Sequence, residues 1–370
     1  MSTFSIGAER ALINGEITSA SIEITDGIIT KVSAQPAEIS ADILISEGVL
    51  TPGFIDLQIN GIADINFFDA DKKTLERGLT LLAQSGVTSC TPSMISAPID
   101  ELVAAIESSD CGESSSGTSL RSRHLGYHIE GPFLANSFSR AHDARYFLDP
   151  TREHLEPLLD TGRVSILTLA PERAHALDAI SALREAGVVV SAGHSGATYV
   201  QMVDAVASGL SMITHLFNGM DKNVNDGIVR AASELRELTI GLIGDGIHNQ
   251  SDQVLWAFEK LGERIALVTD ALGPMLGDKP VNVDSGSSGG AYREDGTLAG
   301  STLTLDKVLA RTIAMGVPLS QALVSATRTP ARLLGRSDLG EIKEGALADL
   351  TQFTSSGSIR TWIGGMEVGR

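Results

Sequence analysis

Four apolar segments in the middle of the chain each run into a histidine or a carboxylate. Residues 188–194 and 212–215 end in His194 and His215, and residues 126–130 and 265–270 end in Glu130 and Asp270. An apolar run that stops at a polar side chain is typical of a buried strand. The strands of a parallel barrel all finish at one face, where catalytic groups of barrel enzymes lie. The pattern therefore predicts an α/β fold, a (β/α)8 TIM-like barrel with these four side chains at its mouth.

Strand-like and helix-like stretches alternate around these segments, as they do in βαβ units. The apolar spacing predicts strands at residues 54–60 and 87–91 and helices at residues 74–85, 99–107, 174–186, 201–208, 301–315 and 319–326. A further helix opens at Thr329. Residues 112–119 and 281–290 are rich in Ser and Gly and are predicted as surface loops.

The two ends of the chain differ from this middle part. Residues 20–25 alternate between polar and apolar side chains, Asp26 and Gly27 form a hairpin-turn pair, and the alternation then resumes. Short strands separated by glycines return after residue 340. We expect residues 1–51 and 339–370 to form one small β-sandwich domain, with the barrel, residues 52–338, inserted between them.

Charge and cysteine content narrow the function classes. The 370 residues carry 28 basic and 46 acidic side chains, a formal charge of −18, which argues against nucleic-acid and anionic-membrane surfaces. The two cysteines, Cys90 and Cys111, give no disulfide framework. The first residues carry no basic region followed by an apolar run. A cytoplasmic enzyme with a small-molecule substrate is the expectation.

Glu130, His194 and His215 together are side chains of the kinds that bind zinc. Each has a simpler explanation alone, because a strand-end glutamate can face water and a lone histidine is more often a hydrogen-bonded structural group. Two histidines one β-α unit apart, with a glutamate, favour the metal site. We expect one divalent ion per subunit, Zn²⁺ first, with Fe²⁺, Mn²⁺ and Co²⁺ as alternatives.

Asp270 is the candidate general base, because it ends an apolar strand near the predicted cation; the alternative is a cap of the turn that follows. His142 and His248 lie in predicted loops, where they could form hydrogen bonds to a substrate. In this hypothesis Asp270 takes a proton from the attacking water and passes it to the leaving nitrogen of an amide. His142 helps to stabilise the oxyanion.

Eight segments carry a resemblance to a known family. They are residues 51–61 (TPGFIDLQING), 128–133 (HIEGPF), 141–143 (AHD), 193–195 (GHS), 214–218 (THLFN), 245–248 (DGIH), 268–271 (VTDA) and 298–304 (LAGSTLT). From about residue 50 to residue 349 the chain resembles the amidohydrolase superfamily, and within it the N-acetylglucosamine-6-phosphate deacetylase family.

The resemblance implies that Glu130, His194 and His215 bind the metal and that Asp270 accepts and then donates the proton. It also implies an amino-sugar substrate and a homodimer in which one subunit completes the site of its neighbour. The residues assigned to substrate binding are Gln58, Ala141, His142, Asn218, Gly219, His248, Leu298, Ala299 and Gly300.

Two positions depart from the family pattern. Many amidohydrolases carry His-x-His at the end of the first barrel strand and hold a second metal there. Gln58 and Asn60 stand at these positions, as in the single-metal branch, and amides are poorer ligands than imidazoles for such ions. The family usually has an arginine that binds the sugar phosphate where this chain has Val224. The cations that could take its place are Lys222, Arg230 and Arg140.

The sequence thus predicts metal-dependent hydrolysis of N-acetylglucosamine 6-phosphate to glucosamine 6-phosphate and acetate. One alternative is a deacetylase of an unphosphorylated or differently decorated N-acyl substrate, favoured by Val224. Another is a non-catalytic sugar-binding regulator. The presence of both the metal-ligand set and Asp270 argues against the regulator, which has no use for a proton acceptor.

Overall fold

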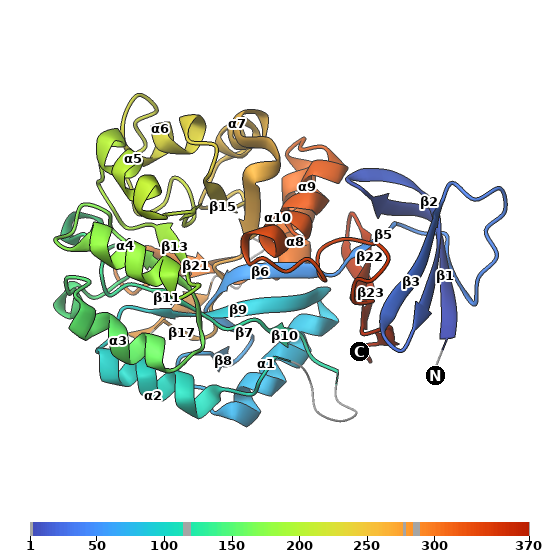
Figure 1. Cartoon of the computed structure of the whole chain (residues 1–370), viewed down its shortest axis with the longest axis horizontal. Coiled ribbons are helices and arrows are strands. Elements are labelled where there is room, and N and C mark those ends of the chain that lie inside the picture. Colours follow the sequence, from blue (N-terminus) through green and yellow to red (C-terminus); the bar gives the residue numbers. More distant parts are fainter. Residues whose placement is uncertain (1–2, 114–119, 277–278, 284–288, 370) are drawn as a thin grey trace.

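The computed structural model describes residues 3–113, 120–276, 279–283 and 289–369, and it contains a parallel barrel with a smaller sheet beside it (Figure 1). Within these ranges nine strands form the barrel sheet. Two of them, β10 (Arg123–His124) and β11 (Tyr127–Glu130), pair with successive parts of the same edge of β9 (Val87–Ile95). Together they fill one strand position, so the barrel has eight strand positions around its circumference. In order, these are β6 (Phe54–Ile59), β9 (Val87–Ile95), β11 (Tyr127–Glu130), β12 (Val164–Leu169), β13 (Val189–Ala192), β14 (Met212–Ile213), β15 (Thr239–Ile243) and β16 (Ile265–Val268). The predicted (β/α)8 barrel is confirmed.

The barrel closes where its last strand, β16, meets its first, β6. An isolated parallel bridge pairs Ile59 with Ala271, and the Asp270 N–H donates to the Gln58 carbonyl oxygen at 2.9 Å. The residues that follow β16 are therefore held directly beside β6.

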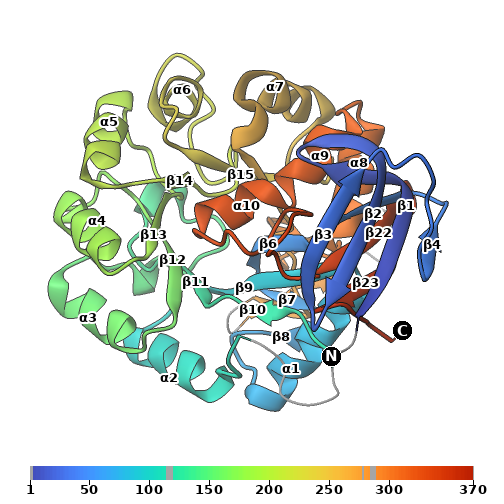
Figure 2. The same ribbon diagram turned by 45° about the vertical axis from the view of Figure 1, so that its right-hand side comes forward.

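Helices surround the barrel strands as a ring (Figure 2). The helices are α1 (Lys72–Gln84), α2 (Ile99–Ser109), α3 (Arg152–Asp160), α4 (Ala176–Glu185), α5 (Tyr199–Ser208), α6 (Gly227–Glu234), α7 (Ser251–Leu261), α8 (Leu305–Ala314), α9 (Leu319–Ser325) and α10 (Arg328–Leu333). Capping side chains in the local sequence determine where several of these helices begin. The Asp71 side chain accepts from the Thr74 N–H at the start of α1, and Thr198 and Gln201 form a capping box on α5.

Short elements decorate the connections between strands and helices. They are β7 (Gly61–Ile62), β8 (Ile65–Asn66), β17 (Met275–Leu276), β18 (Lys279–Pro280), β19 (Asn282–Val283), β20 (Gly290–Tyr292), β21 (Leu298–Ser301) and the 3-10 turns η1 (Asn136–Phe138), η2 (Ala144–Tyr146) and η3 (Gly262–Arg264).

Two sequence predictions need correction in this part of the chain. The helix expected at residues 301–315 begins at Leu305, because residues 298–301 pair with β20 as strand β21. The loop expected at residues 281–290 contains β19 and the start of β20, which pair with one another. Residues 284–288 of that segment, and residues 114–119 of the other predicted loop, lie outside the described ranges.

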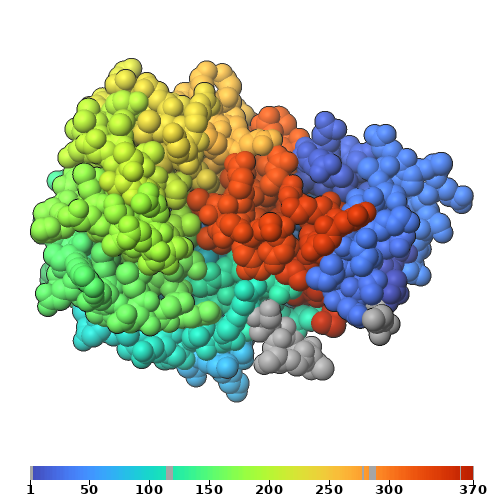
Figure 3. Space-filling model, viewed as in Figure 1, coloured from blue at the N-terminus to red at the C-terminus, as the bar shows by residue number. Residues whose placement is uncertain are grey.

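Both ends of the chain contribute to the smaller sheet, as predicted. Its strands are β1 (Thr3–Ile13), β2 (Glu16–Thr25), β3 (Ile28–Ala34), β4 (Ile43–Ile45), β5 (Val49–Pro52), β22 (Leu350–Thr354), β23 (Gly357–Ile363) and β24 (Met366–Glu367). The strands of the expected sandwich belong to one continuous sheet, in which β22 pairs with β5. Asp26 and Gly27 both have positive φ, 50° and 82°, as a two-residue hairpin turn requires. Figure 3 shows the surfaces of the two chain ends in contact.

Buried apolar side chains of the smaller sheet form a separate hydrophobic cluster, which includes Ile6, Ile22, Leu50 and Trp362. The sheet is joined to the barrel by a buried ion pair. Arg123 Nε lies 2.5 Å from Asp349 Oδ2, and the two side chains are 10% and 3% exposed. Asp349 also accepts from the Gly364 N–H at 2.7 Å. Across the described ranges, no helix combines the length and apolar character needed to cross a membrane.

Candidate active site

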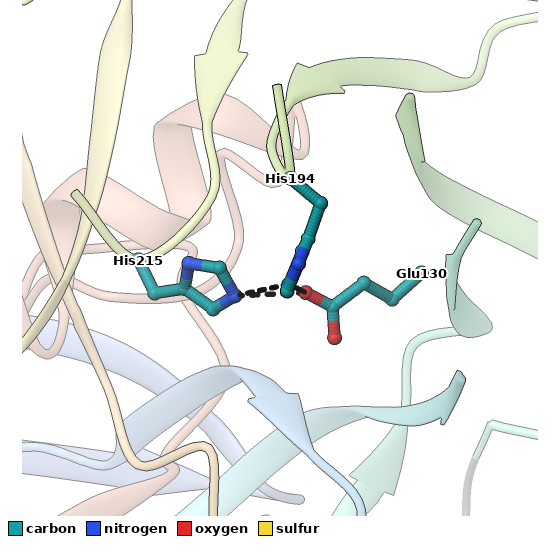
Figure 4. A group of neighbouring side chains, drawn as sticks. All are labelled: Glu130, His194 and His215. Carbon is teal, nitrogen blue, oxygen red and sulfur yellow. Dashed lines mark hydrogen bonds and ion pairs between the residues drawn. The ribbon is translucent and has the colours of Figure 1, made fainter. Parts of the chain in front are cut away.

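The four polar residues predicted at strand ends meet at one mouth of the barrel. Glu130 is the last residue of β11, whereas His194, His215 and Asp270 each follow their strand by two residues. Glu130, His194 and His215 are between 2% and 5% exposed. Figure 4 shows these three side chains pointing toward one another from different strands.

The ligand-type atoms of these three residues converge closely. Glu130 Oε1 lies 2.8 Å from His215 Nε2 and 3.1 Å from His194 Nε2, and the two Nε2 atoms are 3.2 Å apart. Bonds of 2.0–2.1 Å to a tetrahedral zinc ion correspond to separations of about 3.3 Å between ligand atoms. The donor set and its spacing fit a divalent metal ion, and these three residues form the metal-ligand cluster found in the described part of the chain.

The tautomer of His194 supports the same conclusion. Its Nδ1 lies 2.8 Å from the Phe138 carbonyl oxygen and must donate to it, so Nε2 of the neutral ring carries a lone pair. That lone pair faces a carboxylate oxygen of Glu130, and two such acceptors repel unless a cation lies between them. The loop after His194 is fixed as well, because Glu172 accepts from the Ser195 hydroxyl and the Gly196 N–H, each at 2.6 Å.

The electrostatics of the cluster favour a carboxylate surrounded by positive charge. Burial raises the pKa of Glu130, but the neighbouring imidazoles, His215 foremost, outweigh burial and hold that pKa well below its usual range. Burial lowers the pKa of His215, and the attraction of Glu130 raises it above the ordinary value. Glu130 is therefore an anion that can share its charge with a bound cation.

Asp270 lies beside this cluster in a strained backbone conformation. Its φ is +47°, in the left-handed region that non-glycine residues rarely adopt. Burial and the charge of Glu130 raise the pKa of Asp270, and such shifts are common among carboxylates in catalytic sites. Asn60 Nδ2 donates to Asp270 Oδ1 at 2.8 Å and fixes the orientation of the carboxylate.

Gln58 lies beneath the pocket rather than in its wall. It is fully buried, and its Nε2 is 3.1 Å from Glu130 Oε2 and 3.5 Å from Asp270 Oδ1. Gln58 Nε2 thus contacts both carboxylates, and its contact with a substrate stays a prediction. The spacing of two residues between Gln58 and Asn60 predicts that both side chains lie on the same face of the strand. The spacing does not show how deeply Gln58 is buried.

His142 is held as a neutral hydrogen-bond donor. The Ser96 N–H donates to His142 Nδ1 at 3.3 Å, and the Ser96 hydroxyl lies 2.9 Å from the same atom. Burial lowers the pKa of His142 to about 3. The proton of the neutral ring is consequently on Nε2, which lies 3.9 Å from Glu130 Oε2 beside the metal-ligand cluster.

A pocket of about 260 Å³ lies above these residues, and Glu130, His142, His194, His215 and Asp270 line it. Of the predicted substrate contacts, the following line it: Ala141, His142, Asn218, Gly219, His248, Leu298 and Ala299. Gly300 does not line it, and a Cβ added at Gly300 would meet the Asp270 carbonyl oxygen and the Leu272 side chain. Several wall residues were not predicted from the sequence, namely Ile95, Phe217, Leu276 and Thr297. Three of these four are apolar and carry no chemical signal in the sequence.

His248 is oriented by its neighbour Asp245. His248 Nδ1 lies 2.7 Å from Asp245 Oδ2, and the same carboxylate accepts from the Ile247 and His248 N–H groups. The ring is thus fixed with Nε2 left for a ligand in the pocket.

Two cations stand at the rim of the pocket. Arg140 and Lys222 both line it, and neither has a hydrogen-bond or ion-pair partner among the residues that the structure describes. Arg230, the third cation considered above, pairs with Glu234 and stacks 4.0 Å over the Tyr199 ring, away from the pocket wall. In a chain with a formal charge of −18, unpaired cations at a pocket indicate an anionic ligand group.

Known proteins resemble this chain over nearly its whole length. The family model described as "Amidohydrolase family" matches residues 49–368. An N-acetylgalactosamine-6-phosphate deacetylase from Shewanella is 32% identical, covering 96% of this chain and 93% of that protein. An N-acetylglucosamine-6-phosphate deacetylase from Caenorhabditis elegans is 31% identical, covering 89% and 85%.

Solved structures give the same result. A mutant N-acetyl-D-glucosamine-6-phosphate deacetylase from Mycobacterium smegmatis, in complex with N-acetyl-D-glucosamine-6-phosphate, superposes with a TM-score of 0.91 at 29% identity over the full length of both chains. The Pasteurella multocida N-acetylglucosamine-6-phosphate deacetylase gives 0.86 at 26% identity, also over both full lengths. Sequence, fold and site geometry agree, and the chain is a member of the amidohydrolase family.

Proposed function

We propose that this protein hydrolyses the N-acetyl group of an amino-sugar 6-phosphate, with N-acetylglucosamine 6-phosphate as the principal substrate, and releases acetate. The observation that carries the proposal is the convergence of Glu130, His194 and His215 on one point beside Asp270, inside a pocket with unpaired cations at its rim. The names of its relatives support this substrate class.

In this proposal Glu130, His194 and His215 hold one divalent ion per subunit, Zn²⁺ first, with Fe²⁺, Mn²⁺ and Co²⁺ as alternatives. Such an ion, when bound, supplies Lewis acidity toward the amide carbonyl and makes water more acidic. Phe138 and Glu172 fix the ligand His194 through its ring and its following loop.

Asp270 accepts the proton of the attacking water and then donates it to the departing amino nitrogen. Asn60 keeps the carboxylate in one orientation throughout. His142 donates from Nε2 to the developing oxyanion, because its Nδ1 is occupied by Ser96. The sugar is bound by the pocket residues Ala141, Asn218, Gly219, His248, Leu298 and Ala299.

An acetate-release screen tests this function. Purified protein is offered N-acetylglucosamine and N-acetylgalactosamine, each with and without a 6-phosphate. We expect release from the phosphorylated sugars. Release only from plain sugars supports the alternative of an unphosphorylated N-acyl substrate, and binding without release supports a non-catalytic sugar-binding protein.

Metal content is the first quantitative prediction. Protein purified without added metal should contain close to one equivalent of divalent ion by elemental analysis, because Gln58 and Asn60 supply amides where a second ion would need imidazoles. The variant His215→Ala should fall well below one equivalent. Two tightly held equivalents in the wild-type protein would contradict the single-metal site.

The phosphate group is the subject of the second prediction. We propose that Lys222 and Arg140 bind it in place of the arginine that Val224 replaces. A charged hydrogen bond contributes about 1.5–3 kcal/mol, and the exposure of these side chains places each at the low end, about tenfold in kcat/KM. Lys222→Met and Arg140→Met should each lower kcat/KM for the 6-phosphate and leave that for the plain sugar unchanged. Val224→Arg should enlarge the preference for phosphate.

Lys279→Met is the matched control for these variants. Lys279 is a nearby lysine that pairs with Asp143 and does not line the main pocket, so its loss should leave both substrates unaffected. Equal losses for phosphorylated and plain sugar in Lys222→Met would contradict a phosphate contact.

We further propose a homodimer in the cytoplasm. The exposed apolar side chains Val200, Val203 and Val224, which are 66%, 38% and 54% exposed, provide a surface for a second copy near the segment that carries Lys222. Both cysteines are free thiols in the structure, which suits a reducing compartment. The division into a barrel, residues 52–338, and a domain made of residues 1–51 and 339–370 remains our proposal.

A further inference from the structure

A second buried carboxyl group, that of Asp56, lies inside the barrel below the pocket. It is fully buried, stands two residues before Gln58 on β6, and does not line the pocket. Its Oδ2 lies 2.6 Å from the Thr269 hydroxyl, and its Oδ1 accepts from the Thr269 N–H at 3.3 Å and the Gln58 N–H at 3.2 Å. Asp56 therefore joins β6 to the end of β16.

Thr269 precedes Asp270, and its hydroxyl also forms a hydrogen bond with Ala271, the residue that follows Asp270. Its hydroxyl donates to Asp56 and accepts from the Ala271 N–H at 3.2 Å. Asp270, between these two residues, has the positive φ described above. A strained conformation persists only where its surroundings over-determine it, and here the backbone is fixed immediately before and immediately after the strained residue.

The hydrogen bond between Asp56 and Thr269 lies where the first and last strands of the barrel meet. The sheet closes between β6 and β16 through the isolated bridge of Ile59 with Ala271 and the backbone hydrogen bonds around it, whereas β15 and β16 pair at four positions. A side-chain hydrogen bond from Asp56 to Thr269 thus supplies a connection at the seam on which the placement of Asp270 depends.

We propose that Asp56 is a positioning residue for amide hydrolysis: through the Thr269 hydroxyl it holds Asp270 at the distance and angle needed for proton transfer. This inference rests on the proposed function of Asp270 as the proton acceptor. Asp56 touches neither the pocket nor the metal-ligand cluster, so its effect should appear in turnover rather than in substrate or metal binding.

The hydrogen bonds of Asp56 indicate which substitution should preserve this role. Burial raises the pKa of Asp56 to about 7, so the neutral acid is present near neutrality. The neutral acid can donate to Thr269 Oγ1 while the threonine hydroxyl turns to the Gln58 carbonyl, 3.4 Å away. An asparagine can make the same pattern through Nδ2, whereas an alanine makes none of it.

The test compares kcat, KM, metal content and melting temperature of Asp56→Ala, Asp56→Asn, Thr269→Val and Thr269→Ser with the wild-type enzyme. Because a misplaced catalytic group can cost about a hundredfold, we expect kcat to fall tenfold to a hundredfold in Asp56→Ala and Thr269→Val. KM and metal content should stay within about twofold, and Asp56→Asn and Thr269→Ser should recover most of the turnover. Thr269→Val is isosteric and keeps the test valid if Asp56→Ala fails to fold.

Thr351→Val is the matched control. Thr351 is also fully buried and donates to a backbone carbonyl, that of Gly86, but it lies in the smaller sheet. It should lose similar stability with unchanged kcat. If Thr269→Val loses no more kcat than Thr351→Val, or if its loss follows metal content, the inference is overturned. A wild-type protein that hydrolyses no acetylated sugar overturns the proposed function instead.

Discussion

Replacing Asp270 by asparagine is expected to leave the fold and the metal content intact and to lower turnover by about two to four orders of magnitude. Asparagine keeps the Oδ1 that accepts from Asn60, so the side chain can stay in place. It cannot accept the proton of the attacking water, and it cannot supply a proton to the leaving nitrogen. Steady-state rates of acetate release, normalised to bound metal, measure the loss.

Asn60→Asp serves as a comparison for this variant. It places a second carboxyl group beside Asp270 and removes the donor to Oδ1, without removing the proton acceptor. We expect a smaller loss than in Asp270→Asn. An Asp270→Asn enzyme within threefold of wild type would remove Asp270 from the mechanism.

Arg123→Met is expected to lower the free energy of unfolding by about 3–5 kcal/mol, because it leaves the buried Asp349 carboxylate without its partner. The pair lies between the barrel and the smaller sheet, and it is almost fully excluded from water. The double variant Arg123→Met with Asp349→Asn removes both charges and retains an acceptor for the Gly364 N–H, so it should recover much of the loss. Denaturant unfolding measured at constant pH gives these differences.

Arg77→Met is the control for this ion pair. Arg77 also pairs with an aspartate, Asp64, but the side chains are 53% and 69% exposed, so its loss should change stability far less than the loss of Arg123. Equal effects of the two substitutions would show that burial of Arg123 does not govern the stability of the interface.

The strand-end residues could be predicted because each combines two signals that the sequence displays. An apolar run predicts a buried strand, and a histidine or carboxylate at its end predicts a catalytic or metal-binding side chain at the barrel mouth. Glu130, His194, His215 and Asp270 all have both signals, and the structure brings them together. The hairpin at Asp26 and Gly27 was predictable for a similar reason, because the turn depends on two adjacent residues.

Other parts of the site have no such local signal. Phe217 and Leu276 are ordinary apolar residues, and only the path of the loops brings them to the pocket wall. Asp56 reads in the sequence as one polar residue in an apolar strand, and its partner Thr269 is more than two hundred residues away. Ser301, the last residue of strand β21, was predicted as the start of a helix, because the pairing of β21 with β20 is a tertiary contact.

The pairing of β5 with β22 has a consequence for synthesis on the ribosome. Strand β5 ends at Pro52 and its partner begins at Leu350, so the nascent chain must complete the whole barrel before this pair can form. Until then β5 presents an open strand edge of the kind that promotes association with other chains. Translation that stops before residue 349 leaves this edge uncovered, and it also leaves Arg123 without Asp349, so the last segment synthesised completes both the sheet and its attachment to the barrel.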